Sequence, residues 1–88
     1  MRKELLIPEL ADATLPGVPL VEIAGYQRVL VEHHRGISEY TTDQICLNVK
    51  FGQIRIAGSK LEIARMTREQ LVITGFIENV SIFRRSNI

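Results

Sequence analysis

Two adjacent histidines, His33 and His34, are the side chains of this sequence best suited to bind a metal ion or transfer a proton, and Glu32 precedes them. Imidazole does both kinds of chemistry near neutral pH. On a β-strand, however, neighbouring side chains point to opposite faces, so the pair cannot chelate one ion. No further histidine and no cysteine pair completes a metal site of known spacing. We expect one packed and one solvated histidine, and we keep an enzyme or metal protein centred on these three residues as an alternative.

The single cysteine, Cys46, is the other candidate nucleophile. A reactive cysteine needs a cationic neighbour and a base to form its thiolate, and the sequence around Cys46 supplies neither. We therefore interpret Cys46 as a small buried or half-buried hydrophobic residue. One cysteine also excludes an internal disulfide framework and suits a reducing compartment.

The carboxylates argue against catalysis as well. They are spread singly, and no D-x-D or E-x-x-E cluster forms an acid–base pair or a cation site. The chain has no G-x-x-x-x-G-K phosphate loop. We therefore predict that the protein is not an enzyme, has no catalytic residues and needs no cofactor or metal.

The elements that would position these groups are β-strands, because aliphatic residues alternate with polar ones through most of the chain. Turns containing glycine, which supplies the positive φ of tight hairpins, separate the runs. The expected strands span residues 20–24, 27–33, 36–40, 44–50, 53–57, 60–65, 70–74 and 79–83. We predict an all-β fold, a single small domain of about seven or eight short strands in an antiparallel meander or sandwich.

The chain repeats itself weakly. Thr41-x-Asp43-Gln44 and the three residues after it align with Thr67-x-Glu69-Gln70 and the three residues that follow, twenty-six positions later. A period of this size is typical of a three-coil β-solenoid, but hairpins of similar length in a meander also produce it. The short turns favour antiparallel hairpins, so the solenoid is the alternative.

Length and charge set further bounds. The chain has 88 residues, with 11 basic and 10 acidic side chains and a net charge of +1. The apolar run at Leu5-Leu6-Ile7 is broken by Pro8, so we expect neither a signal peptide nor direct membrane insertion. We predict an N-terminal arm over residues 1–16, either a short helix or disordered, a β domain over 17–85 and a tail over 86–88.

One face of the strands is predicted to form the core. Its residues are Ile45, Leu47, Val49, Ile54, Ile56, Leu61, Ile63, Leu71, Ile73, Val80 and Ile82. Four apolar residues fall on the opposite face, and if they gather they form a docking patch for a protein partner: Leu30, Cys46, Val72 and Phe83. The basic pair Arg84-Arg85 follows the last strand and is suited to acidic protein or lipid head groups.

A second function class, single-strand nucleic-acid binding by a small β domain, would use Lys50 and Arg55 with Tyr40 and Phe51 as stacking platforms. Glutamates interleave with the basic residues, and the chain lacks the basic excess of most nucleic-acid binders. We therefore expect no nucleic-acid partner and retain this function as the alternative.

Several short motifs carry a family resemblance through their order and spacing. Residues 29–40 read V-L-V-E-H-H-R-G-I-x-E-Y, and Ile45-x-Leu47-Asn48, Gly52-x-Ile54-x-Ile56-x-Gly58 and Leu71-x-Ile73-x-Gly75 follow. This pattern resembles the YabP/YqfC family of sporulation proteins, and residues 15–25 look most like its YqfC branch. The likeness spans about residues 15–83. The characteristic E-x-H-x-G segment of the family matches Glu32, His34 and Gly36, with His33 where asparagine is common.

The resemblance implies a non-enzymatic structural or adaptor protein required for endospore formation, in spore envelope or cortex development. It implies a cytoplasmic location in the mother cell, peripheral at the outer forespore membrane, and an integral membrane partner resembling YqfD. The family carries no established catalytic residues, so none are transferred. Exposed strand edges make homo-oligomerisation a further expectation.

Overall fold

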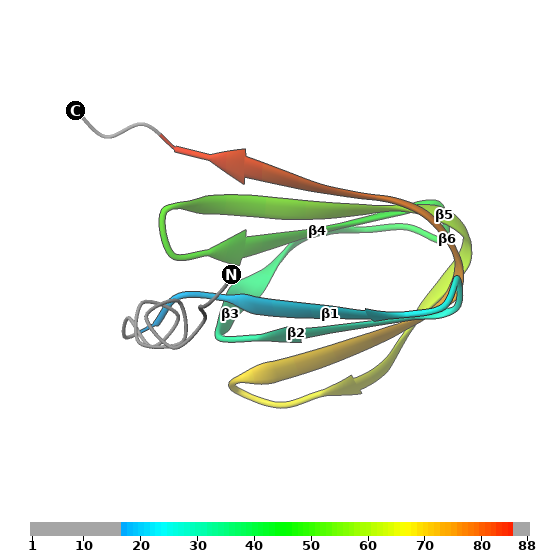
Figure 1. The fold of residues 1–88 in the computed structure, drawn as a ribbon, viewed down its shortest axis with the longest axis horizontal. Helices are drawn as coiled ribbons and strands as arrows, with labels where there is room; N and C mark the ends of the chain where they lie inside the picture. Colours follow the sequence, from blue (N-terminus) through cyan, green and yellow to red (C-terminus); the bar gives the residue numbers. More distant parts are fainter. Residues whose placement is uncertain (1–16, 86–88) are drawn as a thin grey trace, which may run out of the picture.

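Alternating aliphatic and polar residues form the β-strands of this chain. The computed structural model describes residues 17–85, which hold six strands and no helix. The strands are β1 (Leu20–Ala24), β2 (Arg28–Glu32), β3 (His34–Tyr40), β4 (Gln44–Val49), β5 (Gly52–Met66) and β6 (Gln70–Arg84). Each pairs antiparallel with its neighbours in one sheet of order β1-β2-β6-β5-β4-β3 (Figure 1). The predicted all-β antiparallel class is confirmed, and the solenoid is excluded because stacked coils need parallel ladders. The predicted arm over 1–16 and tail over 86–88 lie outside the described residues.

The two longest strands differ from the prediction. β5 and β6 have 15 residues each and run through the segments at Gly58 and Gly75 that were expected to be turns. Extra residues shift the β5–β6 register between Ala57 and Gly58 and again before Glu62, so the strands bend without reversing direction. Residues 17–85 therefore hold six strands rather than the predicted seven or eight. A Cβ atom at Gly58 would overlap the carbonyl oxygen of Phe76, so the bend requires glycine there.

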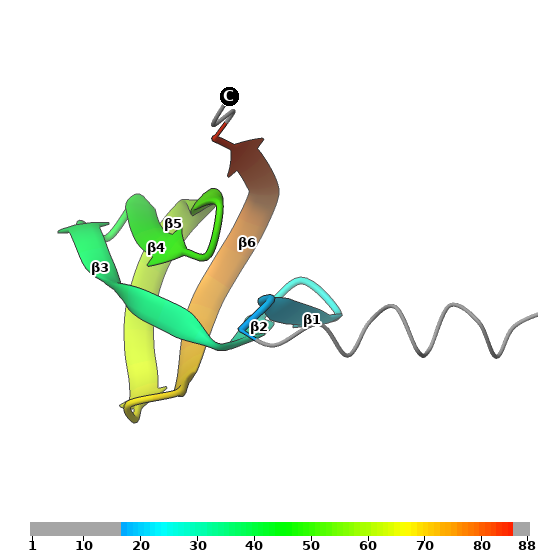
Figure 2. The ribbon, with the colours of Figure 1, turned by 90° about the vertical axis from the view of Figure 1, so that its left-hand side faces the viewer.

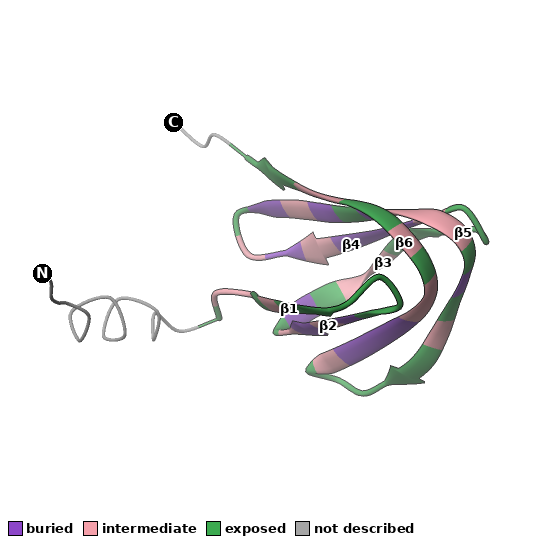
Figure 3. Ribbon diagram, turned by 45° about the vertical axis from the view of Figure 1, so that its right-hand side comes forward, coloured by how far each residue is buried: buried purple, intermediate pink, exposed green. Residues whose placement is uncertain are grey.

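These bends fold the sheet over on itself into two layers (Figures 1 and 2). The lower layer contains β1, β2 and the halves of β5 and β6 that flank their connecting turn. The upper layer contains β4, with β3 along its edge, and the other halves of the two long strands. The buried aliphatic residues form one cluster, and buried segments occur on strands of both layers (Figure 3). This cluster comprises Val29, Val31, Ile45, Leu47, Val49, Ile54, Ile56, Leu61, Leu71 and Ile73.

The predicted core face is confirmed except near its ends. Ile63 and Val80 are half-buried against the core, and Ile82, although it faces the same way, is 70% exposed. Conversely, Val29 and Val31 of β2 are fully buried and were not assigned to the core. Alternation along one strand predicts which side chains share a face, but burial also depends on which strands lie beside and above them.

The internal repeat corresponds to two copies of one hairpin turn. The N–H groups of Thr41 and Thr67 donate to the carbonyl oxygens of Gln44 and Gln70, at 2.8 and 2.7 Å. In return, each threonine Oγ1 accepts the N–H of the same glutamine at 2.9 Å. Threonine side chains stabilise turns in this way. The repeat therefore belongs to hairpins of similar length, as the antiparallel interpretation predicted.

Candidate interaction surface

His34 is buried and both of its ring nitrogens are used to hold the fold. The N–H of Gly36 donates to Nδ1 at 3.0 Å, and Nε2 lies 2.9 Å from the carbonyl oxygen of Thr67. Because Nδ1 accepts, the ring proton is assigned to Nε2, which donates to Thr67. This neutral imidazole connects the start of β3 to the β5–β6 turn. It leaves no ring nitrogen for a metal ion or a substrate.

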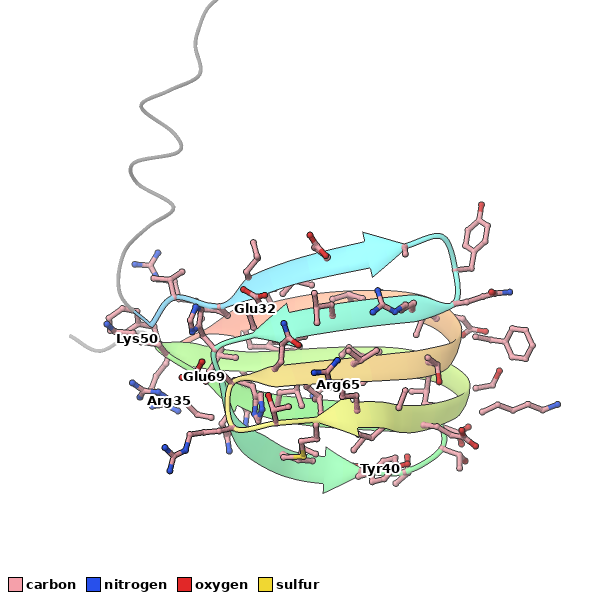
Figure 4. All side chains as sticks on the ribbon, turned by 90° about the horizontal axis from the view of Figure 1, so that it is seen from below. Glu32, Arg35, Tyr40, Lys50, Arg65 and Glu69 are labelled. Atoms are coloured by element: carbon pink, nitrogen blue, oxygen red, sulfur yellow. The ribbon has the colours of Figure 1, made fainter. Side chains whose placement is uncertain are left out.

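His33, in contrast, is exposed and lies between β2 and β3 with φ at +66°. Its N–H donates to the carbonyl oxygen of Glu69 at 2.6 Å. The residue borders a small hollow of about 180 Å³ with Glu32, Glu69, Thr67 and Gln70. Glu32 and Glu69 lie near one another at this end of the sheet (Figure 4). The prediction of one packed and one solvated histidine is thus confirmed. Within residues 17–85 no three His, Cys, Asp or Glu side chains are arranged to hold a metal ion.

Cys46 is 7% exposed and lies in mid-strand on β4. Its Sγ donates a weak hydrogen bond to Oε1 of Glu39, 3.7 Å away. A carboxylate neighbour does not favour a thiolate. The interpretation of Cys46 as a small buried residue is confirmed.

The predicted apolar docking patch is divided between the two layers. Leu30 and Val72 are cross-strand partners in the lower layer, whereas Cys46 and Phe83 lie on strands of the upper layer. Val72 is 6% exposed, and Arg65, its β5 partner, lies beside it on that layer (Figure 4). Phe83, at 44% exposure, is the member of the four that presents a large apolar surface. The structure therefore does not gather the four residues into one patch.

The four side chains considered for nucleic-acid binding are not all brought together either, although Lys50 and Phe51 are neighbours. Tyr40 and Lys50 lie at opposite ends of the β3–β4 hairpin (Figure 4). The Tyr40 hydroxyl oxygen accepts the N–H of Ile63 at 3.4 Å, although the ring is half exposed. The Arg55 guanidinium lies 4.7 Å from the centroid of the Phe83 ring and stacks on it. No continuous groove of cations and aromatic rings therefore joins these residues.

A different group of residues does gather, at the end of the upper layer where β4 turns into β5. We call it the basic–aromatic end, and it comprises Lys50, Phe51, Phe83, Arg84 and Arg85. The N–H of Arg85 donates to the carbonyl oxygen of Phe51 at 2.7 Å, which joins the end of β6 to the turn. The ammonium of Lys50 lies 5.3 Å from the centroid of the Phe51 ring. A shallow hollow lined by Gly52, Gln53, Phe83, Arg84 and Arg85 opens beside them.

Phe51 was considered from sequence as a stacking platform for nucleic acid, but its backbone conformation was not predicted. Its φ is +69° and its side chain is 57% exposed. The turn at Phe51-Gly52 was predicted, and its glycine was expected to take the positive φ. Instead, Gly52 is needed because a Cβ there would overlap the carbonyl oxygen of Phe83. No local sequence signal shows this, since the contact joins residues far apart in the chain.

Fold and surface together define a small antiparallel β domain. His34 and Cys46 make their contacts within the fold, and two exposed rings, Phe51 and Phe83, lie with three cations at one end. In the part of the chain that the structure describes, no helix is long and apolar enough to cross a membrane.

Comparison with known proteins identifies the family. The model of the YabP family matches residues 18–87, and the chain therefore belongs to that family. It is 25% identical over 72 residues to the uncharacterized protein YqfC of Bacillus subtilis (strain 168), an alignment that covers 82% of this chain and 77% of YqfC. No solved structure matches the chain. The predicted resemblance to the YabP/YqfC family of sporulation proteins is confirmed.

Proposed function

We propose that this protein is a non-enzymatic adaptor in endospore formation that docks onto an integral membrane partner through its basic–aromatic end. It acts in the cytoplasm of the mother cell, at the surface of the outer forespore membrane. Membership of the YabP family supports the setting, and one structural observation carries the docking site: an exposed phenylalanine with positive φ at Phe51.

The conformation of Phe51 is costly for the fold. A non-glycine residue in the left-handed region is less stable by about 1–2 kcal/mol, and an aromatic residue is rarely found there. The side chain is 57% exposed, so it recovers little of this free energy through burial in the core. Glycine or asparagine would relieve the strain. Strained residues of this kind occur at binding sites, and the ring of Phe51 is therefore assigned a role in contacting a partner.

The neighbours of Phe51 define the chemistry of that partner. Arg84 and Arg85 are exposed, and Lys50 adds a third cation beside the ring. Arginine and aromatic side chains are enriched at the centres of protein interfaces, and guanidinium groups bind carboxylates in a bidentate manner. A partner segment that complements this end carries acidic side chains next to apolar ones. A cytoplasmic segment of an integral membrane protein resembling YqfD fits the family setting, and it brings the adaptor to the membrane without insertion.

Co-expression with this membrane protein tests the docking site. The tagged chain is purified from a detergent extract, and the amount of co-eluting partner is measured for the wild type and for two arginine variants. Arg85→Glu reverses a charge at the basic–aromatic end, whereas Arg28→Glu makes the same change at an exposed position of β2 near the bend.

We expect Arg85→Glu to reduce the co-eluting partner at least tenfold and Arg28→Glu to leave it unchanged. Equal retention of the partner by both variants would remove the basic–aromatic end as the docking site. No co-elution with the wild-type chain would contradict the adaptor function itself.

A further inference from the structure

The C-terminal half of β6 is a free strand edge. The ladder between β2 and β6 ends at the Arg28–Thr74 pair, and the N–H of Ile77 makes the last contact on that side, with the carbonyl oxygen of Tyr26 at 2.7 Å. From residue 79 to 84, β6 pairs with β5 on one side, and within residues 17–85 no strand pairs with its other side (Figure 1).

The hydrogen bond from the Arg85 N–H to Phe51 shows which backbone groups face this edge. In an antiparallel ladder, hydrogen-bonded and non-hydrogen-bonded pairs alternate. Because Arg85 bonds to the start of β5, Phe83 and Ser81 also direct their N–H and C=O groups toward β5. Val80 and Ile82 therefore direct theirs outward, where another strand can pair with them. The register is regular over this stretch, from the Gly52–Arg84 pair to the Ala57–Asn79 pair.

The other outer strands are less suited to pairing. β3 has two register shifts in its ladder with β4, and such bulges protect an edge. β1 is five residues long and follows Pro19. The β6 edge, by contrast, keeps a regular register from residue 79 to 84, and Ile82 is 70% exposed although it faces the same side as the buried Ile54. An unprotected edge with an exposed aliphatic residue is a template for a further strand.

We propose that a second copy of this chain occupies this edge, with two β6 strands paired antiparallel about Ser81. In this register Val80 lies opposite Ile82 of the second copy. Glu78, the extra residue of the register shift that ends the regular stretch, lies level with Arg84 of the second copy. By two-fold symmetry, each of these pairs forms twice. Both aliphatic residues of a pair lie on the inner face, so the pairing covers the exposed Ile82.

Charge complementarity selects the second copy and this register. Opposite charges directly across two strands stabilise their pairing, and like charges destabilise it. Shifting the register by two residues in either direction keeps the outward backbone groups aligned. One shift places Glu78 opposite Ile82, and the other places it beyond Arg85, so in neither register does Glu78 meet Arg84. The symmetric register about Ser81 is the one that joins both Glu78–Arg84 pairs and both Val80–Ile82 pairs. The upper layers of two molecules then form one continuous sheet.

The mass of the purified chain in solution, measured by light scattering after size exclusion, tests this dimer without any partner. It therefore gives a result that is separate from the docking proposal. We expect the wild type to be a dimer, and Glu78→Arg and Arg84→Glu each to weaken association at least tenfold, because each variant places like charges opposite one another. Mixing the two variants restores a dimer, because each charged pair between the two different chains then joins an arginine to a glutamate. Like charges face one another only when two identical variants meet. The double variant Glu78→Arg/Arg84→Glu also dimerises, since both charges are exchanged.

A second variant tests the strand edge rather than the charges. Ile82→Pro removes an N–H that points away from β5, so the internal ladder is kept. We expect this variant to retain its β-sheet circular dichroism and to be monomeric. A wild-type mass of one chain, a dimer that persists in Ile82→Pro, or a double charge variant that stays monomeric would each overturn the proposal.

Discussion

The Nε2 atom of His34 lies 2.9 Å from the carbonyl oxygen of Thr67, and this hydrogen bond joins β3 to the turn between β5 and β6. Replacing His34 by alanine leaves that carbonyl and the N–H of Gly36 without their partner and opens a cavity. We expect His34→Ala to lower the free energy of unfolding by about 2–3 kcal/mol. Urea unfolding followed by circular dichroism, at equal protein concentrations, measures the difference. A loss below about 0.5 kcal/mol would contradict a structural role for this histidine.

Replacing the neighbouring residue, His33, is expected to preserve or raise stability. His33 has φ at +66°, and asparagine adopts this left-handed conformation more readily than most residues do. The contact of His33 with Glu69 uses the backbone N–H, which asparagine keeps. We therefore expect His33→Asn to be at least as stable as the wild type, with a gain of up to about 1 kcal/mol in the same unfolding experiment. A clear loss of stability would show that the exposed ring has a packing role.

The bend in β5 can be tested through two glycines that differ in their surroundings. A Cβ at Gly58 would overlap the carbonyl oxygen of Phe76, whereas at Gly25 it would meet nothing within 4 Å. Gly25 has φ at +62°, so its replacement is a matter of backbone strain alone. We expect Gly25→Ala to cost about 1 kcal/mol and Gly58→Ala about 3 kcal/mol or more. Equal melting temperatures for the two variants would mean that the close approach at the bend is not required.

The sequence predicted the strands better than their ends. Alternation located every strand, because period two is a local property of the chain. At Gly58 and Gly75 the prediction of turns was wrong, since glycine within a strand marks a bulge as well as a turn. The exposure of Ile82 was not predictable, because it depends on where β2 ends beside β6. Strand order is set by contacts between distant residues, which local patterns do not contain.

The surface was harder to predict than the core, for the same reason. Leu30 and Cys46 both point away from the core, but they lie on different layers, and one strand alone does not reveal which layer it joins. The meeting of Phe51 with Arg85 depends on the pairing of β5 with β6 over their full length. Phe83 and the basic pair after it were found from sequence, because they are adjacent in the chain.

The docking proposal predicts that stability and partner binding change in opposite directions at Phe51. Phe51→Gly relieves the left-handed conformation and removes an exposed ring, so the free energy of unfolding should rise by about 1 kcal/mol. Lys60 provides the matched control, because it also has a positive φ, at +54°, but lies at the bend, away from the basic–aromatic end. We expect Lys60→Gly to have a similar effect on stability.

Co-elution of the YqfD-like membrane protein with Phe51→Gly and with Lys60→Gly is the most direct measurement. We predict that the glycine at position 51 gives a folded, more stable chain that retains at most a tenth of the partner, while the glycine at position 60 retains all of it. Full retention of the partner by Phe51→Gly would contradict the docking site.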